Sequence, residues 1–318
     1  PISTFQFCEN GAKAVTWEAT SKRVTPAFLA ANTVSSLLAK SDFELEGYGR
    51  LTHPLRYDRA SDTFRPVDWD EAFQRIGEVL RGLKPDQVEF YTSGRASNEA
   101  AYLFQLFARE YGTNNFPDCS NMCHEATSVG LPRSIGIGKG TVSLDDFDKT
   151  ELVISIGHNP GTNHPRMMGT LHELARRNVP IIVFNPLRER ALERFADPQS
   201  VIEMATYGST DIASTYFQVK AGGDAAALKG IAKHLLEMES ERGDVLDRAF
   251  IAEHTQGFED FAADIAQTRW DEIERESGLS QAALKQVAEA YAKSNATIIT
   301  YGMGITQHNK GTANVRLI

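Results

Sequence analysis

Three short runs of almost continuous apolar residues recur in the second half of the chain, at 152–157, 180–185 and 297–302. Stretches with a helical spacing of apolar residues separate or flank them, at 165–177, 224–238 and 280–293. A β-branched strand that is apolar on both sides has to be covered by helices on both sides, as in a parallel sheet. The sequence therefore predicts an α/β fold with a parallel sheet flanked by helices.

The first half is less regular. After an irregular start, apolar residues at helical spacing predict a helix over 69–80, with Asp68 and Glu71 at the spacing of a capping box. The segment 88–93 predicts a short strand, and the helical pattern resumes over 97–111. The segments 88–93 and 97–111 thus predict one strand–loop–helix unit.

Polar loops follow the three apolar runs, which end in Gly157, Asn185 and Gly302; they span 157–165, 185–190 and 302–308, and the segment 221–224 opens a helix. Because ligands bind at the carboxyl ends of parallel strands, we expect these four loops to converge on one crevice. Any one glycine there is more simply a turn or a cap, but four such loops favour a nucleotide-bearing cofactor. Neither G-x-G-x-x-G nor a P-loop is present, which disfavours ordinary NAD or ATP binding.

Cys123 stands directly beside His124, near Cys119. A thiolate is a strong ligand for soft metals, and an imidazole exchanges a proton near neutral pH. The simpler interpretation is a buried structural thiol, which we also expect for Cys119. His158, His164 and His172 lie near the expected crevice, and only His164 is retained as a site candidate.

Composition excludes several other classes of function. The formal charge of −9 and the pI of about 5.5 exclude a nucleic-acid surface, so no such partner is expected. No apolar run approaches the roughly 20 residues that span a bilayer. Three cysteines suit a reducing compartment, so a cytoplasmic location is expected. Because the chain starts with Pro1 and ends in what reads as a helix opening, we expect a piece of a longer polypeptide.

Several motifs occur in order along the chain: T-S-G-R-A-S-N-E-A-A-Y at 92–102, C-S-N-M-C-H at 119–124, G-H-N-P-G-T-N-H-P at 157–165 and G-M-G-I-T-Q at 302–307. Together they resemble the catalytic subunits of molybdopterin-dependent oxidoreductases, in the formate-dehydrogenase-like branch. The resemblance runs from about Cys8 to the end and implies a Rossmann-like domain of the formate dehydrogenase/DMSO reductase type.

The resemblance implies a bis-molybdopterin guanine dinucleotide carrying molybdenum or tungsten. Cys123 would be the protein ligand of the metal and His124 its proton partner, while Asp224 would bind the guanine base. Arg95 and Asn98, with Glu99, lie in a family motif and either contact the pterin or tie their loop to its neighbours. The other residues implied to line one guanine dinucleotide arm are Gly157, Asn159, His164, Asn185, Arg188, Gly302, Met303, Gly304, Thr306 and Gln307.

Three features depart from the family pattern. Cys8 matches the last iron–sulfur ligand, but the earlier ligands would precede Pro1, so a 4Fe–4S cluster is expected only in a full-length protein. Asn10 stands where many relatives have a lysine between cluster and pterin, which puts the usual electron path in doubt. Asn185 replaces a common aspartate, and a segment containing Y-G-S-T-D-I-A-S at 207–214 reads as an insertion, either altering contacts to the ribose or forming a surface excursion.

The sequence thus predicts three parts: a remnant of an N-terminal, iron–sulfur-type domain (1–65), an α/β segment of a second domain (66–117) and a Rossmann-like cofactor-binding domain (118–318). The leading hypothesis is a two-electron oxidoreductase that acts on formate or a similar small molecule with an unidentified electron-transfer partner. A non-catalytic cofactor-binding or scaffold relative is the alternative. Without the resemblance, the residues support an unrelated nucleotide-binding enzyme of doubly wound fold.

Overall fold

A parallel sheet of four strands forms the centre of the larger part of the protein. The computed structural model describes residues 8–92, 96–117 and 119–318. The sheet contains β5 (Leu152–Ile156), β6 (Ile181–Phe184), β9 (Thr215–Phe217) and β10 (Thr297–Tyr301), in the order β10-β5-β6-β9 and all parallel. The predicted α/β fold is confirmed, and three of the four strands lie where the apolar runs predicted them.

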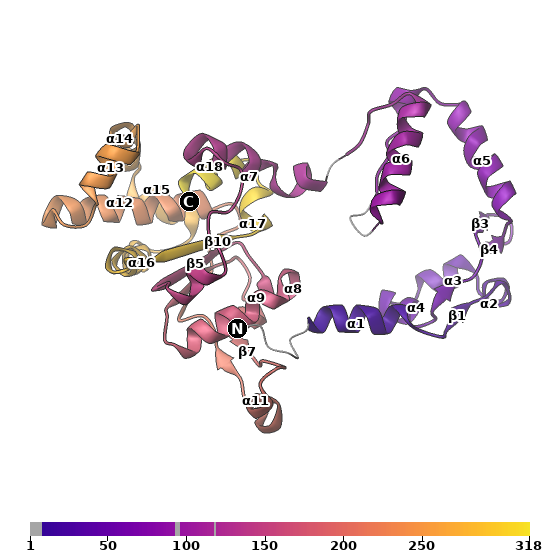
Figure 1. The fold of residues 1–318 in the computed structure, drawn as a ribbon, viewed down its shortest axis with the longest axis horizontal. Helices are drawn as coiled ribbons and strands as arrows, with labels where there is room; N and C mark the ends of the chain where they lie inside the picture. The colour runs from indigo at the N-terminus through magenta and orange to yellow at the C-terminus, as the bar shows by residue number, and fades with distance from the viewer. Residues whose placement is uncertain (1–7, 93–95, 118) are drawn as a thin grey trace. The chain divides into compact units, whose positions relative to one another are not determined.

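Helices and one two-stranded antiparallel sheet, β7-β8, make up the rest of this part (Figure 1). They are α7 (Cys119–Ile135), η2 (Asp145–Asp148), α8 (Pro160–Asn163), α9 (Pro165–Arg176), α10 (Arg190–Glu193), β7 (Arg194–Phe195), α11 (Val201–Thr206), β8 (Thr210–Asp211), α12 (Asp224–Arg242), α13 (Arg248–His254), α14 (Phe258–Gln267), α15 (Trp270–Ser277), α16 (Gln281–Lys293), α17 (Met303–Thr306) and α18 (Gly311–Leu317).

Both faces of the sheet are buried, which explains the continuous apolar runs. Ile154 and Ile156 of β5 pack into a cluster with residues of α12, α15, α16 and α18. Val153, between Ile154 and Leu152, points to the other face and packs with Met168 and Leu171 of α9. Because successive side chains of a strand face opposite sides, a strand covered on both sides needs apolar residues at every position.

The chain divides into two compact units, one made of Asn10–Asp118 and the other chiefly of Cys119–Ile318. The predicted further division at residue 65 stays a prediction. The elements of the first unit are α1 (Glu9–Glu18), β1 (Arg23–Val24), α2 (Pro26–Ala31), α3 (Val34–Leu38), α4 (Asp42–Glu46), β2 (Arg50–Leu51), β3 (Leu55–Asp58), β4 (Thr63–Pro66), α5 (Trp69–Arg81), η1 (Pro85–Gln87) and α6 (Asn98–Tyr111).

The two predicted helices of the first unit are present as α5 and α6. Asp68 caps α5 by accepting a hydrogen bond from the Glu71 N–H at 2.7 Å. The Glu71 carboxylate lies 3.4 Å from the Arg56 guanidinium. Ser97 caps α6 in the same way, accepting from Ala100, and Gly112 ends the helix in the left-handed conformation.

Two predictions about local structure are wrong, and one strand was not predicted. Residues 88–92, the described part of the predicted strand 88–93, form no strand; the Phe90 N–H donates to the Asn115 carbonyl, and its ring packs against α6. The start of the chain is not irregular, because short helices and paired strands fill residues 9–66. The strand that was not predicted is β9, whose three residues pair with β6 and complete the sheet.

None of the helices in the described residues is both long and apolar enough to cross a lipid bilayer.

Candidate functional site

A cavity of about 550 Å³ opens at the carboxyl end of the parallel sheet. Three loops border it, one directly after β5, one after β6 and one after β10, and two residues of α7 complete its lining. The lining residues are Cys123, His124, Gly157, His158, Asn159, Asn163, His164, Asn185, Glu189, Tyr301, Gly302, Met303 and Gly304. Nine of the residues that sequence predicted for the site therefore share one cavity.

Cys123 and His124 lie at an interruption in α7. The backbone of His124 is not helical, with φ −134° and ψ 19°. The helical segments before and after it are therefore joined by a kink. Cys123 is half-buried and carries a free thiol, whereas His124 is exposed. The His124 Nδ1 atom lies 3.4 Å from the Thr127 hydroxyl, one turn further along. The interruption thus presents a thiol and an imidazole to the same cavity.

The turn after β10 holds the backbone around Cys123. The Thr306 hydroxyl donates to the carbonyl oxygen of Cys123, and the Gln307 side-chain amide donates to that of Met122 at 3.1 Å. Thr306 is buried, and neither it nor Gln307 lines the cavity. Their predicted contact with a cofactor stays a prediction, whereas their contact with α7 is a structural role that sequence did not indicate.

The loops after β5 and β10 touch through their backbones. Gly157 has a φ of +56°, which favours glycine, and its carbonyl accepts a hydrogen bond from the Gly304 N–H at 3.0 Å. A Cβ atom on Gly304 would lie 2.6 Å from the Gly157 oxygen. The two glycines therefore let the backbones of the loops after β5 and β10 come into contact, which a side chain on Gly304 would prevent.

His158 and His164 form a hydrogen-bonded pair at the cavity, with 2.9 Å between His158 Nε2 and His164 Nδ1. His158 is 6% exposed, and the Asn185 amide donates to its backbone carbonyl at 3.4 Å. Burial, and secondarily the neighbouring His164, lowers the pKa of His158 to about 4. His158 is therefore neutral at pH 7. His164 was predicted as a site residue and His158 was not. The position of His158 directly after Gly157, at the end of a predicted strand, is the feature of the sequence that could have indicated it.

We expect the neutral state of His158 to make the stability of the chain depend on pH. The unfolded histidine takes up a proton near pH 6.5 and the folded one only near pH 4, so stability is full above pH 6.5 and falls as the pH drops towards 4. The loss is about 3 kcal/mol at most. Urea unfolding at several pH values should show this slope in the wild type and a weaker slope in His158→Gln. His254→Gln, at an exposed histidine of α13, should keep the wild-type slope.

The loop after β6 brings a carboxylate to the cavity. The Asn159 amide donates to the Glu189 carboxylate at 2.7 Å, and Asn159 also caps α8. Glu189 was not predicted. Arg188 was predicted as a site residue but does not line the cavity. Its guanidinium lies 2.5 Å from the Glu193 carboxylate and 5.2 Å from the centroid of the Tyr216 ring.

Asp224 lies under the carboxyl edge of the sheet. It begins α12, is 3% exposed, and borders a small buried space beside Ile156 and Phe184, the last residues of β5 and β6. Its Oδ1 atom has no hydrogen-bond partner in the described part of the chain, and burial raises the pKa of the carboxyl group. The expectation that four loops line one crevice is thus correct for three; the 221–224 segment does not line the cavity.

The remaining candidates lie elsewhere. Arg95 lies outside the described residues, and Asn98 is exposed in the first turn of α6, within the first unit. Cys8 is half-buried with a free thiol, directly before α1. His172, which was not retained as a site candidate, does not line the cavity and contacts the Glu203 carboxylate at 2.7 Å.

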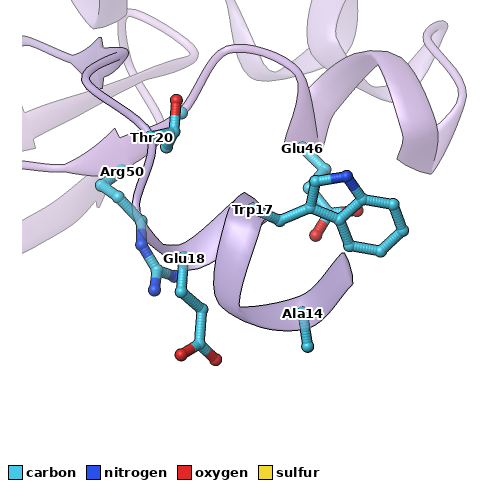
Figure 2. Close-up of a pocket in the computed structure, with 7 residues that line it drawn as sticks. Ala14, Trp17, Glu18, Thr20, Glu46 and Arg50 are labelled. Carbon is cyan, nitrogen blue, oxygen red and sulfur yellow. The ribbon is translucent and has the colours of Figure 1, made fainter. Parts of the chain in front are cut away.

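The first unit has a hollow of its own, of about 380 Å³. Figure 2 shows Trp17 and Glu18 of α1 in it, with Glu46 at the end of α4 and Arg50 of β2. None of the predicted site residues lines this hollow. It does not compete with the cavity at the sheet as the candidate site.

Comparison with known proteins agrees with the fold and with the family suggested by the motifs. The family model of the molybdopterin oxidoreductases matches residues 50–318. Among solved structures, the acetylene hydratase from Pelobacter acetylenicus has a similar fold, with a TM-score of 0.62, 17% identity, and coverage of 98% of this chain and 36% of that one.

Three curated relatives give the range of sequence similarity. Protein YdeP of Escherichia coli K12 is 56% identical over 320 residues, which cover 99% of this chain and 42% of YdeP. The uncharacterized oxidoreductase Rv2900c of Mycobacterium tuberculosis H37Rv is 45% identical, over 98% of this chain and 40% of that protein. Formate dehydrogenase H of E. coli K12 is 30% identical, over 84% of this chain and 35% of that protein. The chain spans less than half the length of each.

Proposed function

The chain belongs to the molybdopterin oxidoreductase family, and from this premise we propose that its cavity holds one arm of a bis-molybdopterin guanine dinucleotide whose metal, molybdenum or tungsten, is bound by Cys123. The observation that carries the proposal is the position of the Cys123 thiol in a cavity at the carboxyl end of a parallel sheet. Nucleotide-bearing ligands bind at that edge of such sheets, and thiolates bind soft metals.

The residues present suit such a group. Among the described residues, no cluster of three or more His, Cys, Asp or Glu side chains could hold a metal, so Cys123 needs further ligands from a cofactor. Gly157, Gly302 and Gly304 leave backbone open at the cavity. The unpaired oxygen of buried Asp224 is an acceptor without a donor, which is costly unless a ligand supplies one. Asp224 does not line the cavity, so we propose that the guanine end of the arm extends beyond it to the start of α12, where the guanine amine supplies the donor.

In the proposed reaction, Cys123 anchors the metal and His124 exchanges a proton with the substrate. When bound, the cofactor supplies the capacity to accept two electrons. The contacts from Thr306 and Gln307 to the carbonyls of Cys123 and Met122 hold the backbone that carries the thiol. His124, one residue further on, keeps its imidazole within the same cavity, where it works as a general acid or base.

The substrate we propose is formate or a similarly small molecule, on the strength of the 30% identity with formate dehydrogenase H. A shared scaffold does not fix the substrate, so this step rests on the relative alone. Cys8 is proposed as a ligand of an iron–sulfur cluster in the full-length protein, which would pass electrons to a separate partner.

Elemental analysis of the full-length parent, purified anaerobically from a host that makes the pterin cofactor, tests the proposal. We expect about one molybdenum or tungsten per chain and about twice as much GMP after acid hydrolysis, since each of the two pterins carries one guanine nucleotide. Folded protein with neither metal nor GMP would contradict it and favour the scaffold alternative. If the parent contains metal and GMP but does not reduce redox dyes, the proposed cofactor site stands and the proposed oxidoreductase activity is rejected.

A further inference from the structure

We propose that Tyr301 is a positioning residue that acts through Thr127 to hold the His124 imidazole in one tautomer, with its proton on Nε2. The inference rests on the proposed function, in which His124 is the proton partner. It assigns a role to a residue at the end of β10 that the motifs did not single out, although it lines the same cavity as His124.

Two successive hydrogen bonds carry the proposal. The Tyr301 hydroxyl lies 3.0 Å from the Thr127 hydroxyl, which in turn lies 3.4 Å from His124 Nδ1. Thr127 and Tyr301 are half-buried and come from positions 174 apart in the chain. The contact therefore joins the interrupted helix α7 to the central sheet, beside the α17 contacts that hold Cys123.

The chemistry of the three groups sets the direction of donation. A phenol is a stronger acid than an aliphatic alcohol, so Tyr301 is the better donor and Thr127 accepts from it. Thr127 has one proton of its own, and it can then donate to His124 Nδ1. A nitrogen that accepts carries no proton, so the neutral ring has its proton on Nε2.

This tautomer suits a site for a small anion. His124 is exposed, so packing does not fix its ring, and the hydrogen bond to Nδ1 has to do so. In the described part of the chain, Nε2 of His124 has no hydrogen-bond partner. Because His124 lines the cavity, its Nε2–H group is then available to donate to an oxygen of a bound carboxylate.

The test is nuclear magnetic resonance of the 318-residue chain labelled in histidine with ¹³C and ¹⁵N, at a fixed pH about two units above the ordinary histidine pKa of roughly 6.5. His124→Gln identifies the His124 signal. We expect the Nε2–H tautomer in the wild type. Tyr301→Phe and Thr127→Val should each lower the ratio of this tautomer to the other about fivefold, the factor for loss of a hydrogen bond of about 1 kcal/mol.

Two variants separate positioning from general disturbance. Thr127→Ser keeps the hydroxyl and should retain the wild-type ratio, and Tyr291→Phe, at an exposed tyrosine of α16, should leave it unchanged. A wild type with its proton on Nδ1, or an unchanged ratio in both Tyr301→Phe and Thr127→Val, would overturn the proposal. Because the chain is measured without metal, such a result leaves the Cys123 assignment standing. Conversely, a full-length parent without metal would reject the assignment of Cys123 as a metal ligand and would not affect the tautomer measurement.

Discussion

We expect replacement of Cys123 by alanine in the full-length parent to lower the proposed turnover at least about 10³-fold, which corresponds to about 4 kcal/mol of activation free energy. The reason is that Cys123 is the only metal-ligating side chain that we propose for the metal. The thiol is half-buried, so its loss changes the free energy of unfolding by less than about 1 kcal/mol. Dye-linked turnover and urea unfolding of the same preparation measure the two quantities.

Cys119→Ala provides the matched control, since it removes a thiol four residues earlier for which sequence predicts only a structural role. It should retain turnover. Undiminished turnover in Cys123→Ala, with metal still bound, would reject Cys123 as the ligand. Loss of turnover in both variants would place the effect in the fold of this segment and not in the metal bond.

Periodicity was sufficient where an element is long or fully buried. The helices α9, α12 and α16 follow from apolar spacing because each packs one face into a buried cluster, and the strands β5, β6 and β10 follow from their nearly continuous apolar runs. Strand β9 has only three residues, too few for a pattern, and is fixed by pairing with β6. Conversely, residues 88–92 have the composition of a strand, but Phe90 packs against α6 instead.

The candidate site was predictable to the extent that the fold was. Loops after parallel strands must meet, so Gly157, Asn185 and Gly302 could be placed together without coordinates. Contacts between distant segments could not be predicted this way. Tyr301 was not singled out by any motif, and the motif that contains Thr306 does not indicate a contact with α7. Only the folded chain brings the two residues to positions of α7 that are 174 and 183 residues away.

The close contact of the loops after β5 and β10 predicts a large effect on stability. Replacement of Gly304 by alanine places a Cβ atom 2.6 Å from the oxygen and 2.7 Å from the Cα of Gly157. These are backbone atoms, so relief requires the two strand ends to separate and the Gly304–Gly157 hydrogen bond to break. We expect a loss of about 3 kcal/mol in the free energy of unfolding, from overpacking and from the lost hydrogen bond.

Fluorescence of Trp270 reports on the unit that contains the cavity. The other two tryptophans are Trp17 and Trp69. Both are replaced by phenylalanine in the reference protein and in each variant, so that Trp270 is the only tryptophan that fluoresces. Gly169→Ala is the matched control: this glycine lies in α9 with nothing within 4 Å of the place that an alanine methyl group would occupy, so alanine should be neutral or stabilise by up to about 1 kcal/mol. Equal urea midpoints for Gly304→Ala and Gly169→Ala would show that the strand ends separate at little cost. The cavity between them would then be adjustable, and its glycines would not be needed to hold the two loops together.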